Sequence, residues 1–161
     1  PARMIRFCHE HPEDGTCKPQ LEFALSNEEA AATLESPALA AERAKASDDH
    51  SLPGVKAVFA MAPVVQPLTP ASLSAMRVPV AIIAGAADVT VPPTTHALVA
   101  KPLIPGATVT ILPGVTHYSF LATCSAAAVK EVSVCRDATV QESAHRAAIA
   151  AALDLFDRAL R

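Results

Sequence analysis

The chain has 161 residues, of which 51% are hydrophobic and 18% are charged, so it is long and apolar enough to fold around a core. Thirteen Lys and Arg residues against sixteen Asp and Glu residues give a net charge of -3. No basic run offers a surface for a phosphate backbone, so nucleic acid is not an expected partner. Every apolar run is broken by proline, charge or threonine well before the roughly 18 residues that a membrane span requires.

The first part of the chain, residues 1–54, carries signals of helices and loops. Pro1 to Arg6 neither begins with methionine nor leads into the apolar segment of a signal peptide, so we expect a processed or cut N-terminus. Arg3 to Glu10 is a short amphipathic stretch. Ser26 to Glu29 matches a capping box, in which Ser26 and Glu29 each accept a hydrogen bond from the other's backbone amide. We therefore expect a helix to begin after Ser26.

Three segments of the second part, residues 55–161, have the patterns of β-strands. Val55 to Met61 and Val78 to Ala84 are nearly continuous apolar runs, which is typical of strands buried on both faces of a parallel sheet. Pro79 marks the beginning of the second strand, because proline cannot donate to a ladder. Ala107 to Leu112 alternates polar and apolar residues, which predicts a strand near the edge of the sheet.

Helical signals lie between and after these strands. A short helical turn is expected near Ala71 to Met76, and a helix from Pro92 to about Lys101. A second capping box, Thr139 to Glu142, predicts a last helix that runs to the end of the chain. Its residues at helical spacing would pack on the sheet, and these are Ala144, Ala148, Ala151, Leu155 and Ala159. Residues 55–161 are therefore predicted to form an α/β core of order β-α-β-α-β-α, with parallel strands and right-handed crossovers.

The four cysteines form two pairs that are close in the sequence. We predict disulfides between Cys8 and Cys17 and between Cys124 and Cys135, each closing a short loop. Disulfides are typical of an oxidising compartment, so we expect a periplasmic or secreted protein. Two alternatives stay open: reduced cysteines in the core, and a metal site at Cys8, His9, His11 and Cys17, although this run lacks the usual zinc knuckle.

Two titratable residues follow predicted strands at the point where each strand ends. Asp88 comes after the strand Val78 to Ala84, and His117 comes after the strand Ala107 to Leu112. Because ligands bind outside the carboxyl ends of parallel strands, both side chains are expected at one edge of the sheet. An aspartate can there fix the tautomer of a histidine and stabilise its imidazolium form, which is the acid-base half of a catalytic triad.

The loops around these two residues resemble those of a known family. Ala84 to Pro92 and Leu112 to Phe120 look like the acid and histidine loops of α/β-hydrolases. Together with Val58 to Pro63, the histidine loop is similar to the dienelactone-hydrolase-like branch of exported hydrolases, which is related to the platelet-activating-factor acetylhydrolases. The resemblance covers roughly residues 55–160. It implies a serine ester hydrolase without a cofactor or metal, a small-molecule ester as substrate, and Asp88 and His117 as catalytic residues.

One part of the family pattern is missing. The strained turn that exposes the nucleophile needs the sequence Gly-x-Ser-x-Gly, and none is present. The resemblance therefore implies that this chain is the C-terminal part of an α/β-hydrolase fold, a single partial domain over residues 1–161. An N-terminal fragment or a second chain would supply the serine. The alternative is a hydrolase-derived module for binding or interaction that has no catalytic activity.

Several other residues that could take part in chemistry are interpreted as structural or have no assigned role. Tyr118 and Phe120 are expected to anchor the histidine loop in the core, with substrate contact as the lesser interpretation. His145 is interpreted as a packing or capping residue of the last helix. The remaining histidines have no supporting context in the sequence, and these are His9, His11, His50 and His96.

Overall fold

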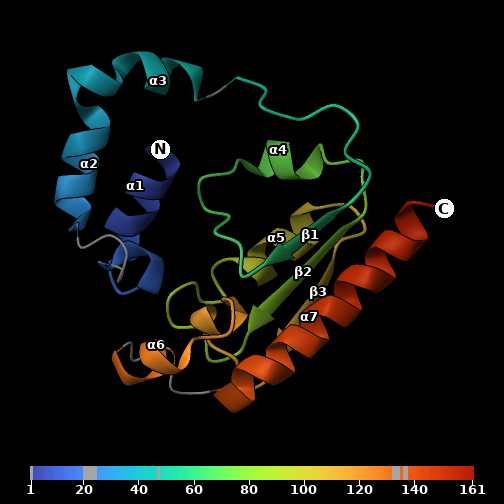
Figure 1. Ribbon diagram of the computed structural model, residues 1–161. Helices are drawn as coiled ribbons and strands as arrows, with labels where there is room; N and C mark the ends of the chain where they lie inside the picture. The colour runs from blue at the N-terminus through green and yellow to red at the C-terminus, as the bar shows by residue number, and fades with distance from the viewer. Residues whose placement is uncertain (1, 20–24, 47, 132–134, 136–137) are drawn as a thin grey trace.

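A computed structural model describes residues 2–19, 25–46, 48–131, 135 and 138–161 (Figure 1). The N-terminal part contains the helices α1 (Ala2–Glu10), α2 (Asn27–Glu35) and α3 (Ala40–Lys45), with 3-10 turns at Gly15–Cys17 and Pro37–Leu39. The α/β part contains β1 (Val58–Met61), α4 (Pro70–Ser74), β2 (Val80–Gly85), α5 (Ala97–Leu103) and β3 (Thr108–Leu112). A 3-10 turn at His117–Phe120 then leads to α6 (Ala126–Glu131) and α7 (Ala138–Ala159).

The three strands form one parallel sheet in the order β1-β2-β3. Val58 pairs with Val80, and Ala81 pairs with Thr108, so the carboxyl ends of all three strands lie at the same edge. The mixed α/β architecture with parallel strands is therefore as expected. Every residue of the central strand β2 is buried, as its continuous apolar run predicted.

Helices lie on both faces of this sheet (Figure 1). Alternate residues of β2, namely Val80, Ile82 and Ala84, form a core cluster with Leu73 of α4 and with residues of α5. The long helix α7 contacts β1 and β2. Its buried apolar residues are Ala144, Ala148 and Leu155, three of the five that its helical spacing predicted, while Ala151 and Ala159 are half-buried. The sheet is thus the middle layer of three.

The prediction that the first strand is buried on both faces is wrong. The strand begins at Val58, and Val55 is exposed. The residues of β1 are half-buried or exposed, because within the described part of the chain β1 pairs only with β2. The apolar pattern is that of an inner strand, whereas the position is that of an edge strand.

Two predicted helix starts also differ from the structure. The helix expected from Pro92 begins at Ala97, because His96 has a non-helical backbone (φ -126°, ψ -84°). The side chain of His96 is buried and contacts Thr16 and Val65. The last helix begins at Ala138, one residue before the predicted start at Thr139. The residue before Ala138 is outside the described part. The first predicted capping box is confirmed, with Ser26 and Glu29 bonded reciprocally.

The structure contains both disulfides in the predicted pairing. The Cα atoms of Cys8 and Cys17 are 5.2 Å apart, and those of Cys124 and Cys135 are 5.6 Å apart. Since Cys8 and Cys17 are bonded to each other, they are not available as thiolate ligands for a metal. The first bridge ties α1 to the 3-10 turn that follows it, and Phe7 packs with both cysteines in a small second core. The helices α2 and α3, which bury no residue, form an arm beyond it (Figure 1).

Candidate active site

Asp88 lies in the loop that follows β2, and its carboxylate is completely buried. One carboxylate oxygen, Oδ1, accepts hydrogen bonds from the backbone N–H groups of Thr90 (3.0 Å) and Val91 (2.7 Å). Short loops of this kind are typical of aspartate, which bonds to backbone groups two and three residues further on. These bonds satisfy Oδ1 and leave the second oxygen, Oδ2, for another partner.

That partner is His117, the first residue of the 3-10 turn after β3. The Nδ1 atom of His117 lies 2.9 Å from Oδ2 of Asp88. The turn is held by a capping box, in which Thr116 and Ser119 bond to each other through side chains and backbone. The imidazole is 29% exposed, so it reaches the surface while its partner does not. The structure thus brings together the two residues that the sequence singled out.

Backbone contacts hold the two loops side by side. The N–H of Ala86 donates to the carbonyl of Leu112 (2.8 Å), and the N–H of Ala87 donates to the carbonyl of Val115 (3.0 Å). Gly85 allows this approach, because a Cβ atom at that position would lie only 2.0 Å from the carbonyl oxygen of Val115. The separation between Asp88 and His117 is therefore set by the backbone.

The bond at Nδ1 determines which nitrogen of His117 can exchange a proton. An ionised carboxylate only accepts hydrogen bonds, so the proton of the neutral ring lies on Nδ1 and the lone pair lies on Nε2. If Nε2 takes up a proton, the buried carboxylate of Asp88 stabilises the resulting imidazolium. The pair is arranged to act as a general base and then as a general acid.

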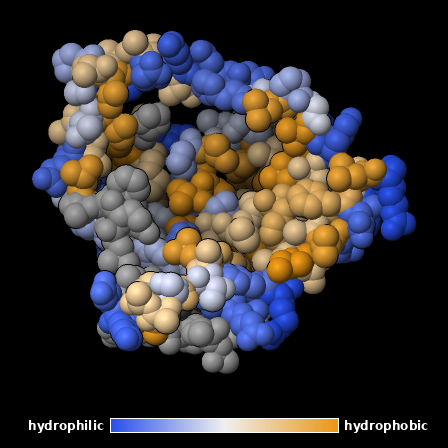
Figure 2. Space-filling model, in the orientation of Figure 1, coloured by the Kyte–Doolittle hydropathy of each residue, from blue (hydrophilic) through white to orange (hydrophobic). Residues whose placement is uncertain are grey.

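A cavity of about 440 Å³ lies beside His117, within the size range of small-molecule sites. Its lining is mostly apolar and comes from four segments that are far apart in the sequence. These are Met4 and Thr16, then Met61, Ala62 and Val64, then Thr90 and Val91, and finally His117, Tyr118, Phe120 and Leu121. Figure 2 shows hydrophobic side chains gathered in the middle of this face, where the molecule is hollowed between the N-terminal helices and the α/β core.

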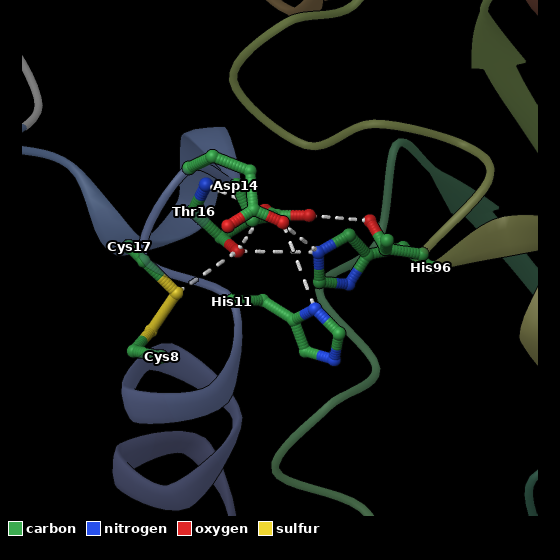
Figure 3. The surroundings of a disulfide bond; sticks show 8 residues. Cys8, His11, Asp14, Thr16, Cys17 and His96 are labelled. Atoms are coloured by element: carbon green, nitrogen blue, oxygen red, sulfur yellow. Dashed lines mark hydrogen bonds and ion pairs between the residues drawn. A yellow bond between two sulfur atoms is a disulfide. The ribbon is translucent and has the colours of Figure 1, made fainter.

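A second buried aspartate and histidine hold the N-terminal segment against this core (Figure 3). The hydroxyl of Thr16 donates to Oδ1 of Asp14 (2.6 Å), and its oxygen lies 3.3 Å from Nε2 of His96. On the other side of the ring, Nδ1 accepts the backbone N–H of Val65 (3.3 Å). The hydroxyl of Thr95 donates to Oδ2 of Asp14 (2.7 Å). This pattern requires a neutral His96 that donates from Nε2.

The environment of this network lowers both pKa values. Burial lowers the pKa of His96 below its ordinary value of 6.5, and the nearby Asp14 carboxylate opposes this effect only in part. Burial alone would raise the pKa of Asp14, but the hydrogen bonds from Thr16 and Thr95 outweigh it and leave the pKa below 3.8. At neutral pH the network therefore holds a neutral histidine and an ionised carboxylate.

We expect acid to destabilise the fold in two ranges of pH. The unfolded chain binds a proton at His96 more readily than the folded chain does, so the free energy of unfolding decreases as the pH falls below about 6.5. The lowered pKa of Asp14 adds a second decrease below about 3.8. Urea unfolding of the chain and of His96→Gln at pH 7.5 and 5.5 tests the first range. The variant is expected to lose less stability between these pH values than the wild type.

The control for this comparison is His9→Gln, because His9 is an exposed histidine at the end of α1. This variant is expected to follow the wild type at both pH values. An equal loss of stability in the wild type and in His96→Gln would show that His96 is not the group that senses acid.

The structure corrects the interpretation of the two aromatic residues of the histidine loop. Tyr118 and Phe120 are half-buried and line the cavity, whereas Ser119 between them is the buried residue. Tyr118 meets the ring of His117 edge-on, with centroids 5.5 Å apart. His145 of α7 bonds to the carbonyl of Leu121 (2.8 Å), which agrees with its interpretation as a packing or capping residue.

Sequence reasoning missed His96, which it left without a role. It also missed Met4 and Thr16 as parts of the cavity. Pro12 and Gly15 favour a turn around Asp14, but nothing in the sequence connects this aspartate with a histidine 82 positions later. The other histidines without context stay near the surface: His11 packs on the ring of Phe7, and His9 and His50 are exposed.

A comparison of the chain with models of protein families, with curated proteins and with solved structures finds no match. Among the helices of the described residues, none is both long and apolar enough to cross a membrane. The function is therefore inferred from the geometry of Asp88, His117 and the cavity.

Proposed function

We propose that this chain carries the acid and the base of a serine ester hydrolase of the α/β-hydrolase class, and that a segment outside residues 1–161 supplies the serine. The observation that supports this proposal is the 2.9 Å contact between His117 and the buried Asp88, at the carboxyl edge of a parallel sheet. An apolar cavity beside the histidine provides space for the substrate. Asp88 precedes His117 in the chain, which is the order of acid and base in this class.

The reaction would proceed through an acyl-enzyme. The serine hydroxyl attacks the carbonyl carbon of the ester while Nε2 of His117 takes the hydroxyl proton. The same proton then passes to the oxygen of the leaving alcohol as the carbon–oxygen bond breaks. In the second half, His117 takes a proton from water, the resulting hydroxide attacks the acyl group, and the serine leaves with that proton. Asp88 holds the ring in position and stabilises the imidazolium in both halves.

The side of β1 that faces away from β2 supports a place for the proposed additional segment. Within the described residues β1 pairs on one side only, so backbone groups of Val58–Met61 on the other side can pair with a further strand. A parallel strand added there would end at the same edge of the sheet as the loops of Asp88 and His117. Met61 and Ala62, at the end of β1, already line the cavity. A serine that follows the added strand would thus stand beside the site.

The cysteines favour a location outside the cytoplasm for the proposed enzyme. Both disulfides close short loops, and such bonds persist in the periplasm or outside the cell. The first bridge lies in a segment that lines the cavity, and the second begins four residues after the histidine loop. Reduction of these bonds would therefore release two segments that are close in sequence to residues of the site.

Labelling with a fluorophosphonate probe tests the proposal. The polypeptide that precedes residue 1 in the native gene product, or a polypeptide that co-purifies with the chain, is expected to carry the labelled serine. The same preparation is expected to hydrolyse 4-nitrophenyl acetate. The isolated chain is expected to do neither, because its base has no nucleophile to activate. Stoichiometric labelling of a serine within residues 1–161 would contradict the proposal, and a preparation with both parts but no labelling would favour the non-catalytic alternative.

A further inference from the structure

The cavity beside His117 has one wall that does not belong to the sheet or its loops. This wall comes from residues 2–17, which comprise α1, the turn after it and the Cys8–Cys17 bridge, and we call it the N-terminal wall. Two of its residues, Met4 and Thr16, line the cavity together with His117. Thr16 is tied by its hydroxyl to Asp14, so Met4 is the apolar residue that the wall contributes.

Met4 packs against a small hydrophobic core within the N-terminal wall. Its half-buried side chain packs against a cluster of Phe7, Cys8 and Cys17, and the disulfide joins two members of that cluster. Methionine has three side-chain torsions and fills irregular space, so its end can adapt to a neighbouring apolar group while its base is held. The disulfide therefore fixes the residues against which Met4 packs.

The N-terminal wall is fixed to the acid loop as well as within itself. Gly15 lies against the backbone of Val89, where a Cβ atom would come within 1.7 Å of the carbonyl oxygen. Asp14 accepts the hydroxyl of Thr95, and the guanidinium of Arg3 donates to the carbonyl of Leu68 (2.9 Å). These contacts connect residues at both ends of the wall with the α/β core. These contacts thus fix the position of the wall relative to the loop that carries Asp88.

We infer that the N-terminal wall determines the specificity of the site, and that Met4 sets the length of the alkyl group that the cavity admits. The inference rests on the proposed function, because it assigns the alkyl group to an ester. The mostly apolar lining fits an unbranched alkyl chain rather than a charged group. Affinity is expected to increase about fourfold for each CH₂ group that fits, and to stop increasing when the chain reaches Met4.

The experiment uses the isolated chain, in which esters are expected to bind without reacting. Ethyl acetate, ethyl butyrate, ethyl hexanoate and ethyl octanoate are titrated, and the ring signals of His117 are followed by NMR. Met4→Ala removes three heavy atoms, so the cavity is expected to admit alkyl chains that are about two CH₂ groups longer. The affinity of the next longer ester is then expected to rise about 15-fold. Met4→Trp is expected to reduce the length of the longest alkyl chain that the cavity admits. Met4→Leu, which nearly conserves volume, is expected to leave it unchanged.

The matched control is Ile5→Ala, since Ile5 is a half-buried residue of the same helix that does not line the cavity. An unchanged length limit in this variant, together with the expected shifts at Met4, supports the inference. If the esters bind and the limit is the same in the wild type, Met4→Ala and Met4→Trp, the inference fails and the proposed function stands. If Ile5→Ala shifts the limit as much as Met4→Ala, the inference also fails. If no ester perturbs His117 in the wild type, both fail.

Discussion

Replacement of Asp88 by Asn is expected to reduce the kcat of ester hydrolysis by about 10³- to 10⁴-fold in the preparation that includes the serine. The amide has nearly the same shape as the carboxylate, so Thr90 and Val91 can still bond to it at Oδ1. Its N–H group would face Nδ1 of His117, however, and this would move the ring proton to Nε2. The histidine then has no lone pair toward the serine, and its imidazolium has no charged partner.

Initial rates of 4-nitrophenyl acetate hydrolysis and urea unfolding are measured together for this variant. His117→Ala is expected to lose at least as much activity, because it removes the base itself. The control is His50→Ala, since His50 is exposed and bonds only to the carbonyl of Lys45 among the described residues. A folded Asp88→Asn protein with a rate within tenfold of the wild type would show that Asp88 is not the acid of the triad.

The positions of Asp88 and His117 were predictable because they depend on local sequence patterns. Each residue lies a few positions after an apolar run, and parallel strands bring their carboxyl ends to one edge. The close approach at Gly85, where the two loops touch through their backbones, was not predictable. It depends on the contact with Val115, which no local pattern encodes.

The failures of prediction come from contacts between distant segments. The helix α5 begins at Ala97 and not at Pro92, because the ring of His96 is held by Thr16 and Val65. These two residues lie 80 and 31 positions earlier in the chain. The apolar run at Val55 to Met61 predicted an inner strand, yet β1 has a single neighbour in the described residues. An apolar pattern indicates that a segment is suited to burial. It does not identify the distant segment of the chain that covers it.

Replacement of both Cys8 and Cys17 by serine is expected to lower the free energy of unfolding of the N-terminal wall by about 2–3 kcal/mol. The bridge closes a loop with a sequence separation of 9, so its removal returns conformational freedom to the unfolded segment. Amide exchange measures this locally. The N–H groups of Cys17 and Lys18 bond to the carbonyls of Asp14 and Gly15, and the exchange at these two positions is expected to accelerate about 30- to 150-fold in the variant.

The matched control is the double replacement of Cys124 and Cys135, which opens a loop of similar length, with a sequence separation of 11. It is expected to accelerate exchange in the segment that follows the histidine loop and to leave positions 17 and 18 unchanged. Because Met4 packs on Cys8 and Cys17, only the first variant is expected to lose the limit on ester chain length. Equal exchange at positions 17 and 18 with and without the first bridge would mean that Asp14, Thr16 and His96 hold the wall alone.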